Sequence, residues 1–163
     1  MESPQPGCYA SKSLMPDRWP SPDRVSAVTE WTRTWRPGPG PAAGHVTFFA
    51  MGGASGGPRP DGTAYPHRNA AFVLDIGTKW KPGTAPADIS TLLEQTRAMH
   101  RTLRRHLRTD AAYVNFPAPD LRDWQRAYCG ANYDRLVEVK RRYDAAGLFD
   151  YPQALGGPGS GNR

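Results

Sequence analysis

The segment NAAFVLDIGTKW, residues 69–80, decides the fold because its side chains alternate as they do along a β-strand. One face of this predicted strand is apolar and consists of Ala70, Phe72, Leu74 and Ile76. The opposite face combines small side chains with one carboxylate and consists of Ala71, Val73, Asp75 and Gly77. Small residues around Asp75 leave room for a ligand, which makes Asp75 a candidate substrate-binding residue. A solvent-exposed Asp75 without a ligand is the alternative, and the sequence pattern alone favours it.

Two further strands are predicted, one before and one after this segment. His45–Met51 precedes it and Ala111–Phe116 follows it. In the later strand, Tyr113 and Asn115 share one face, while apolar residues share the other. Because two polar side chains on one face of a strand are typical of a cavity lining, we expect Tyr113 and Asn115 to face a cavity.

Helices are predicted at about residues 22–35, from Thr91 to about Leu107, from Pro119 to Gly130 and at about 132–143. The second of these starts at a capping box of Thr91 and Glu94 and carries an apolar stripe: Leu92, Met99, Leu103 and Leu107. Strands and helices of unequal length, without regular alternation, predict an α+β fold in which an antiparallel β-sheet is covered by α-helices. A sheet of so few strands has two exposed edges, so we expect the domain to be incomplete.

Composition limits the classes of partner. The chain has 163 residues, a net charge of +6 and a pI near 9.6. Five arginines lie opposite the apolar stripe: Arg97, Arg101, Arg104, Arg105 and Arg108. Such a tract can bind phosphate backbones, but without interleaved aromatic residues or a nucleic-acid-binding motif it is more typical of a solvated helix face. We therefore expect no nucleic-acid partner.

Other features bear on location and metal binding. The sequence has neither a secretory leader nor an apolar stretch of membrane-spanning length, so we expect no membrane contact and a cytoplasmic location. Cys8 and Cys129 match neither a metal site nor a disulfide framework, so both are expected to be free thiols. The four histidines, among them His45, are not spaced as metal ligands, and no metal site is predicted.

Three motif segments follow one another along the chain. The first is Met51–Ala54 followed by Thr63–Arg68, the second is Tyr113–Phe116 followed by Asp120, and the third is Tyr128–Leu136 followed by Lys140, Tyr143, Asp144, Phe149 and Gln153. Together they resemble the C-terminal half of the berberine-bridge and oligosaccharide-oxidase flavoproteins, within the vanillyl-alcohol-oxidase-like superfamily. Residues Cys8–Met15 are also similar to the entry of that family into its substrate domain. The chain departs from the family pattern at Phe116, which lacks an aromatic hydroxyl, at Cys129 and at Ala145.

The resemblance implies the C-terminal, substrate-side part of an FAD-linked oxidoreductase. Residues 1–155 would form an incomplete substrate domain with a berberine-bridge-like segment at about 110–155, and residues 156–163 would be a disordered tail. FAD is the cofactor implied, held mainly by a larger domain to which nothing in this sequence corresponds. The glycine-rich segment at 52–57 follows a strand but opens no helix, so it is not typical of phosphate binding. We therefore expect this chain alone not to retain FAD, and a separate FAD-binding domain or chain is a candidate partner.

The resemblance also implies roles for individual residues. Tyr113 would be the general base that takes a proton while hydride passes to the flavin, although a phenol needs a nearby positive charge or hydrogen bond for this. A Tyr113 hydroxyl satisfied at a sheet edge is the structural alternative. Asn115 would orient the phenol or the flavin edge, and Asn132 and Tyr133 would contact the flavin or, alternatively, cap the helix and pack under the sheet. The predicted reaction oxidises a hydroxylated small molecule, a natural product or a sugar; the alternative is a truncated, non-catalytic binding module that keeps the fold without FAD.

Overall fold

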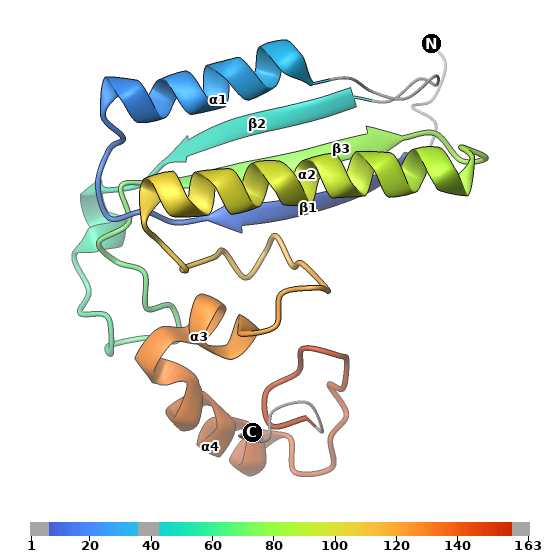
Figure 1. Ribbon diagram of the computed structural model, residues 1–163. Helices are drawn as coiled ribbons and strands as arrows, with labels where there is room; N and C mark the ends of the chain where they lie inside the picture. The colour runs from blue at the N-terminus through green and yellow to red at the C-terminus, as the bar shows by residue number, and fades with distance from the viewer. Residues whose placement is uncertain (1–6, 36–42, 158–163) are drawn as a thin grey trace, which may run out of the picture.

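Three antiparallel strands form the sheet in the part of the chain that the structure describes. The computed structural model describes residues 7–35 and 43–157. The strands are β1 (Cys8–Leu14), β2 (Ala43–Ala50) and β3 (Phe72–Trp80), in the order β1-β3-β2. β3 is the central strand and pairs antiparallel with both neighbours (Figure 1). The predicted α+β class, with helices on an antiparallel sheet, is confirmed, as are the two strands predicted around residues 45–51 and 70–80.

The third predicted strand, Ala111–Phe116, is wrong. This segment is irregular, and its backbone groups are satisfied one at a time by different parts of the chain. The Ala111 carbonyl accepts a hydrogen bond from the Met15 N–H, while the Tyr113 N–H donates to Ser13 Oγ at 2.8 Å. A side-chain hydroxyl thus occupies the place of a ladder partner, and the third strand of the sheet is β1 instead.

Two helices cover one face of the sheet. They are α1 (Pro22–Thr34) and α2 (Pro86–Leu107), and Figure 1 shows both on the same side of the strands. Their apolar side chains pack on the alternating apolar residues of the strands in one buried core: Leu14, Phe72, Leu74, Ile76, Met99, Leu103 and Leu107. The apolar stripe predicted for α2 is therefore confirmed, but its start is not. Pro86 begins the helix, so Thr91 lies within it and the predicted capping box does not form.

Within residues 7–35 and 43–157, no helix packs on the opposite face of the sheet (Figure 1). The strand pairing shows that this face is polar at its centre. Gly77 of β3 pairs with Ser11 of β1 and His45 of β2. Two residues further along β3, on the same face, Asp75 lies between Ser13 and Thr47. We refer to this side, opposite α1 and α2, as the open face.

The C-terminal segment, residues 109–157, forms a small separate core below one end of the sheet (Figure 1). It contains α3 (Trp124–Cys129), the short 3₁₀ helix η2 (Gly130–Asn132) and α4 (Tyr133–Tyr143). α4 confirms the last predicted helix, whereas α3 begins at Trp124 and not at Pro119. The buried residues that form this C-terminal core are Ala112, Trp124, Ala127, Tyr128 and Cys129. The tail predicted to be disordered lies, from residue 158 onward, outside the described residues.

The arginine-rich face of α2 is largely paired with carboxylates. Arg97 bonds to Asp120, Arg101 to Glu94 and Arg104 to Asp110. Among the described residues, no helix combines the length and apolar character that crossing a membrane requires. Both cysteines are free thiols, as predicted, with Cys8 exposed and Cys129 buried.

Candidate functional site

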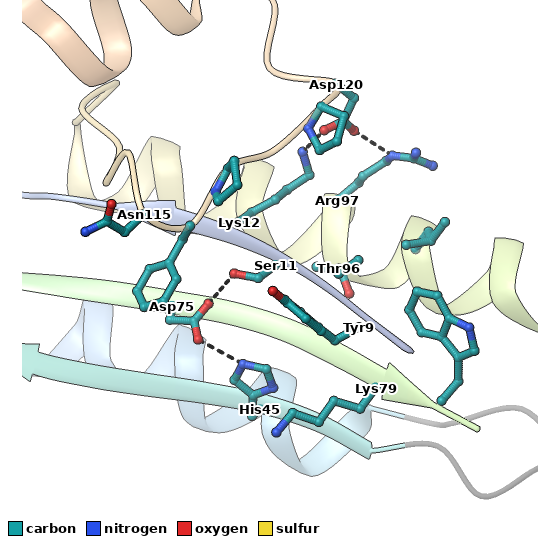
Figure 2. Close-up of a pocket in the computed structure, with 16 residues that line it drawn as sticks. Tyr9, Ser11, Lys12, His45, Asp75, Lys79, Thr96, Arg97, Asn115 and Asp120 are labelled. Atoms are coloured by element: carbon teal, nitrogen blue, oxygen red, sulfur yellow. Dashed lines mark hydrogen bonds and ion pairs between the residues drawn. The ribbon is translucent and has the colours of Figure 1, made fainter. Parts of the chain in front are cut away.

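A depression of about 740 Å³ lies over the open face and is bounded by the C-terminal segment (Figure 2). Ser11, His45 and Asp75 provide its central polar groups. Tyr9 and Lys79 lie toward one end and Asn115 toward the other, as the labelled side chains of Figure 2 show; Trp80 and Phe116 also line the depression. The depression therefore brings together residues from all three strands, from α2 (Leu93, Thr96 and Arg97) and from the segment that follows α2.

Asp75 is the most buried carboxylate of this depression, with 8% of its surface exposed. Ser11 Oγ donates a hydrogen bond to Asp75 Oδ1 at 2.6 Å, and His45 Nε2 lies 2.9 Å from Asp75 Oδ2. Each carboxylate oxygen is thus held by a side chain from a different edge strand. The structure contradicts the exposed Asp75 that the sequence pattern favoured, because two neighbouring strands and the C-terminal segment enclose its position in the central strand. Asp75 instead lines the depression, and its role in binding a substrate stays a prediction.

Gly77 makes this arrangement possible. A Cβ atom at Gly77 would lie 2.3 Å from His45 Cε1 and 2.7 Å from His45 Nε2, far inside van der Waals contact. The imidazole of His45 therefore lies across the glycine and reaches Asp75 diagonally from its own paired position. The Ser11 hydroxyl donates to Asp75 and not to the imidazole, so these three residues do not form the relay that activates a nucleophilic serine.

A second charged group closes the depression at its rim. Lys12 Nζ bonds to Asp120, and Arg97 Nε donates to the same carboxylate at 2.9 Å. Burial opposes the ionisation of Asp120, but the hydrogen bonds from Lys12 and Arg97 outweigh it and lower the pKa of this carboxyl. The rim thus links β1, α2 and the C-terminal segment through one carboxylate.

His100 of α2 lies behind this rim. Burial, together with the positive charge of Lys12, lowers the pKa of His100 to about 4, although a hydrogen bond with the Ser13 backbone opposes the shift. His100 is therefore neutral near pH 7 and fills space between α2 and β1 without adding charge.

Tyr113 and Asn115 lie in different surroundings. Asn115 lines the depression, and its Nδ2 donates to the Tyr113 hydroxyl at 3.0 Å. The Tyr113 ring is half-buried and packs edge to face against Tyr65 and Phe116, with ring centroids 6.2 and 5.4 Å away. Tyr113 is not among the residues that line the depression. Its hydroxyl reaches the site through Asn115.

Asn132 and Tyr133 lie away from the depression. Asn132 is buried, and its Nδ2 donates to the carbonyl oxygens of Pro60 and Thr63 at 2.7 and 3.0 Å. It makes no side-chain cap on α4, so the capping alternative is wrong, and its amide holds the preceding loop instead. Tyr133 packs edge to face on Trp124 with ring centroids 5.8 Å apart, in a cluster whose members all lie in the C-terminal segment and not under the sheet.

The sequence pattern missed Ser11 and His45. His45 was considered only as a metal ligand, and among the described residues no group of three or more His, Cys, Asp or Glu side chains could hold a metal ion. A signal for its role was present in Gly77, since a glycine inside a central strand marks a place where another group approaches closely. Ser11 could not be recognised because β1 itself was not predicted.

Comparison with protein families and relatives agrees with this geometry. Residues 112–156 match the family model described as berberine and berberine like. An uncharacterized FAD-linked oxidoreductase, YgaK from Bacillus subtilis, is 33% identical over 106 residues, which are 65% of this chain and 22% of that protein. The aclacinomycin-N/aclacinomycin-A oxidase of Streptomyces galilaeus is 25% identical over 130 residues, which are 71% of this chain and 24% of the oxidase.

Solved structures show the same fold. GilR, an oxidoreductase that catalyses the terminal step of gilvocarcin biosynthesis, superposes with a TM-score of 0.79 at 24% identity, covering 92% of this chain and 33% of GilR. The glycopeptide hexose oxidase DBV29 superposes with a TM-score of 0.78 at 21% identity, covering 95% and 33% of the two chains. The present chain thus corresponds to about a fifth of the length of the curated relatives and about a third of these solved chains.

Proposed function

We propose, on the premise that this chain has the C-terminal, substrate-side fold of a berberine-bridge-like FAD-linked oxidoreductase, that its open face covers a flavin ring and holds a hydroxylated substrate against it. The substrate would be a natural product or a sugar. The observation that supports this most directly is Asp75, a buried carboxylate that two donors fix beneath a depression of about 740 Å³. A buried, oriented carboxylate in a cavity is a candidate for binding a hydroxyl group and accepting its proton.

The described residues suit the ring system of FAD better than its phosphates. The depression is wide, mostly apolar in its walls and polar at Asp75, His45 and Asn115, which suits a planar heterocycle and a hydroxylated partner. The glycine-rich segment forms the short 3₁₀ helix η1 (Gly53–Gly56) and then a loop, so it offers no α-helix N-terminus for a pyrophosphate. We therefore propose that a separate FAD-binding domain or chain holds most of the cofactor.

The chemistry divides between the cofactor and this chain. A bound flavin supplies the acceptor for the hydride that leaves the substrate carbon. Asp75 accepts the hydrogen bond of the substrate hydroxyl and takes its proton, so that the O–H bond breaks as the carbonyl forms. Asn115 orients the substrate or the ring edge from the other end of the depression. Tyr113 is the second candidate for the proton acceptor. Its hydroxyl contacts Asn115, whereas the neighbouring Phe116 has no hydroxyl that could take this role.

A chimera tests this proposal. The present chain would replace the matching C-terminal portion of the Streptomyces galilaeus oxidase, so that the flavin-binding part of that enzyme supplies the cofactor. We expect the purified chimera to retain flavin, and some members of a panel of sugars and hydroxylated polyketides to bleach its absorbance without oxygen. Asp75→Asn should keep the flavin but slow bleaching by about 10²–10⁴-fold, and Tyr113→Phe by less.

The control is Glu94→Gln, an exposed carboxylate on α2 that bonds to Arg101. Equal bleaching rates in wild type and Asp75→Asn would remove Asp75 as proton acceptor. A chimera that holds flavin and binds panel compounds but is never reduced would instead support the alternative of a non-catalytic binding module.

A further inference from the structure

His45 occupies an unusual place in the sheet. It lies on the edge strand β2 and pairs with Gly77, yet its ring extends diagonally to Asp75. Ser11 does the same from β1, so the two neighbours of Gly77 meet the two oxygens of one carboxylate. Figure 2 shows Ser11 and His45 approaching Asp75 from opposite sides.

The glycine and the buried imidazole both lower the stability of the folded sheet. A glycine in a strand interior weakens the strand, because it loses more conformational entropy on folding and has no side chain to pack. Gly77 is nevertheless required, since even one added carbon would collide with His45 Cε1 at 2.3 Å. The other ring nitrogen, Nδ1, is buried and has no hydrogen-bond partner, which is also unfavourable. The hydrogen bond to Asp75 is the contact that this geometry preserves.

The chemistry of the pair fixes the position of the ring proton. An ionised carboxylate can only accept hydrogen bonds, so His45 must carry its proton on Nε2 to bond to Asp75 Oδ2. Nδ1 is then unprotonated, in agreement with its lack of an acceptor. His45 thus donates to the carboxylate through Nε2.

We propose that His45 is a positioning residue that holds Asp75 in the orientation for proton transfer, an inference that rests on the proposed function. In the reaction proposed above, the substrate O–H and C–H bonds would break as the carbonyl forms. The O–H proton would bond to the Asp75 carboxylate, and a bound flavin would supply the acceptor for the hydride. His45 keeps its own proton throughout. Ser11 supports the carboxylate from the other side, and Gly77 provides the space that the imidazole needs.

The first test uses this chain alone and does not depend on any flavin. In protein labelled with ¹⁵N-histidine, long-range proton–nitrogen spectra show which nitrogen of each ring carries the proton, and His45→Gln identifies the His45 signals. We expect the Nε2–H form in the wild type, and a mixture of the two neutral forms in Asp75→Ala and in Gly77→Ala. Ser26→Ala, on the exposed side of α1, is the control and should leave the signals unchanged.

A wild-type His45 with its proton on Nδ1, or His45 signals identical in wild type and in both variants, would overturn the proposal. Gly77→Ala keeps both His45 and Asp75 and changes only the space between them. The inference therefore remains testable if Asp75→Ala does not fold.

The second test uses the flavin-loaded chimera. His45→Leu should slow flavin reduction by about 10–100-fold, as loss of a supporting hydrogen bond does at other sites, with little change in the substrate concentration at half-saturation. His45→Gln keeps an N–H donor and should restore much of the rate, which a purely structural role does not predict. A loss confined to substrate binding, or equal rates in Leu and Gln variants, would contradict the proposal. A chimera that is never reduced would contradict the proposed function. The spectra come from the chain without flavin, so they would still show whether His45 positions Asp75.

Discussion

The two faces of β3 are buried by different kinds of neighbour. On the side of α1 and α2, Leu74 and Ile76 are fully buried among aliphatic and aromatic side chains. On the open face, the alternate residues Asp75 and Gly77 are also shielded, but by a serine, a histidine and the wall of a depression. The comparison indicates that apolar burial on one face stabilises the fold, while the other face is free to carry polar groups that packing alone would not select.

The largest difference between the two faces is expected when the same side chain, asparagine, is placed at two adjacent positions of β3. Leu74→Asn removes a fully buried aliphatic group and introduces an amide with no partner in an apolar core, so we expect a loss of at least about 3 kcal/mol in the free energy of unfolding. Asp75→Asn keeps an oxygen that can accept a hydrogen bond from Ser11 or His45, and should cost only about 1–2 kcal/mol. Urea denaturation followed by circular dichroism measures both values. Equal losses would show that the two faces contribute alike to stability.

The sequence pattern predicted the apolar face well. Leu74 and the α2 stripe follow the periods of strand and helix, and burial of such stripes is what periodicity reports. It could not predict β1, because Ser11, Lys12 and Ser13 give a polar segment with no apolar alternation, and this strand is recognised only by what it pairs with. Pairing partners also explain the wrong strand prediction at Ala111–Phe116. Polar and apolar side chains do alternate there, but the Tyr113 N–H bonds to Ser13 Oγ and not to the backbone of a neighbouring strand.

The candidate site shows the same limit. Asp75 was found from the small residues around it, but the choice between exposure and enclosure depended on the neighbouring strands and the C-terminal segment, which are distant in sequence. Asn115 was correctly expected to face a cavity, whereas its neighbour Tyr113 packs mainly against Tyr65 and Phe116, because the segment is not a strand. Periodicity assigns faces within one element; it does not say which elements meet.

A smaller effect is expected from pH, at the boundary between the two faces. Since burial lowers the pKa of His100 to about 4, below the ordinary value of 6.5, the unfolded chain binds this proton more readily than the folded one. Stability from this group is therefore complete above about pH 6.5 and is lost as pH falls toward 4, by about 2–3 kcal/mol. His100→Gln removes the titrating ring, so the difference in stability between wild type and variant should shrink by this amount over that range.

Urea midpoints measured at intervals between these pH values test this expectation. The charges facing His100 are Lys12 and Arg104, which disfavour its protonation, and Asp120, which favours it. His106→Gln, at an exposed position on the same helix, is the matched control. A constant difference between wild type and His100→Gln across the range would show that His100 is not held neutral by its surroundings.

The smallest effect concerns the junction between the sheet and the C-terminal segment, where Asp120 bonds to both Lys12 and Arg97. The carboxyl is partly exposed, so water and salt screen these contacts, and Asp120→Asn should lower the free energy of unfolding by about 1 kcal/mol or less.

Two measurements should nevertheless identify the junction. Its contribution should decrease at high salt, and limited proteolysis should cut the Asn variant faster between α2 and α3, because Asp120 holds this connection on β1. Asp17→Asn removes an exposed carboxylate that pairs with the neighbouring exposed Arg18, and it should change neither property. If Asp120→Asn and Asp17→Asn are digested at the same rate, the charged rim does not hold the segment, and the apolar contacts of the open face must hold it instead.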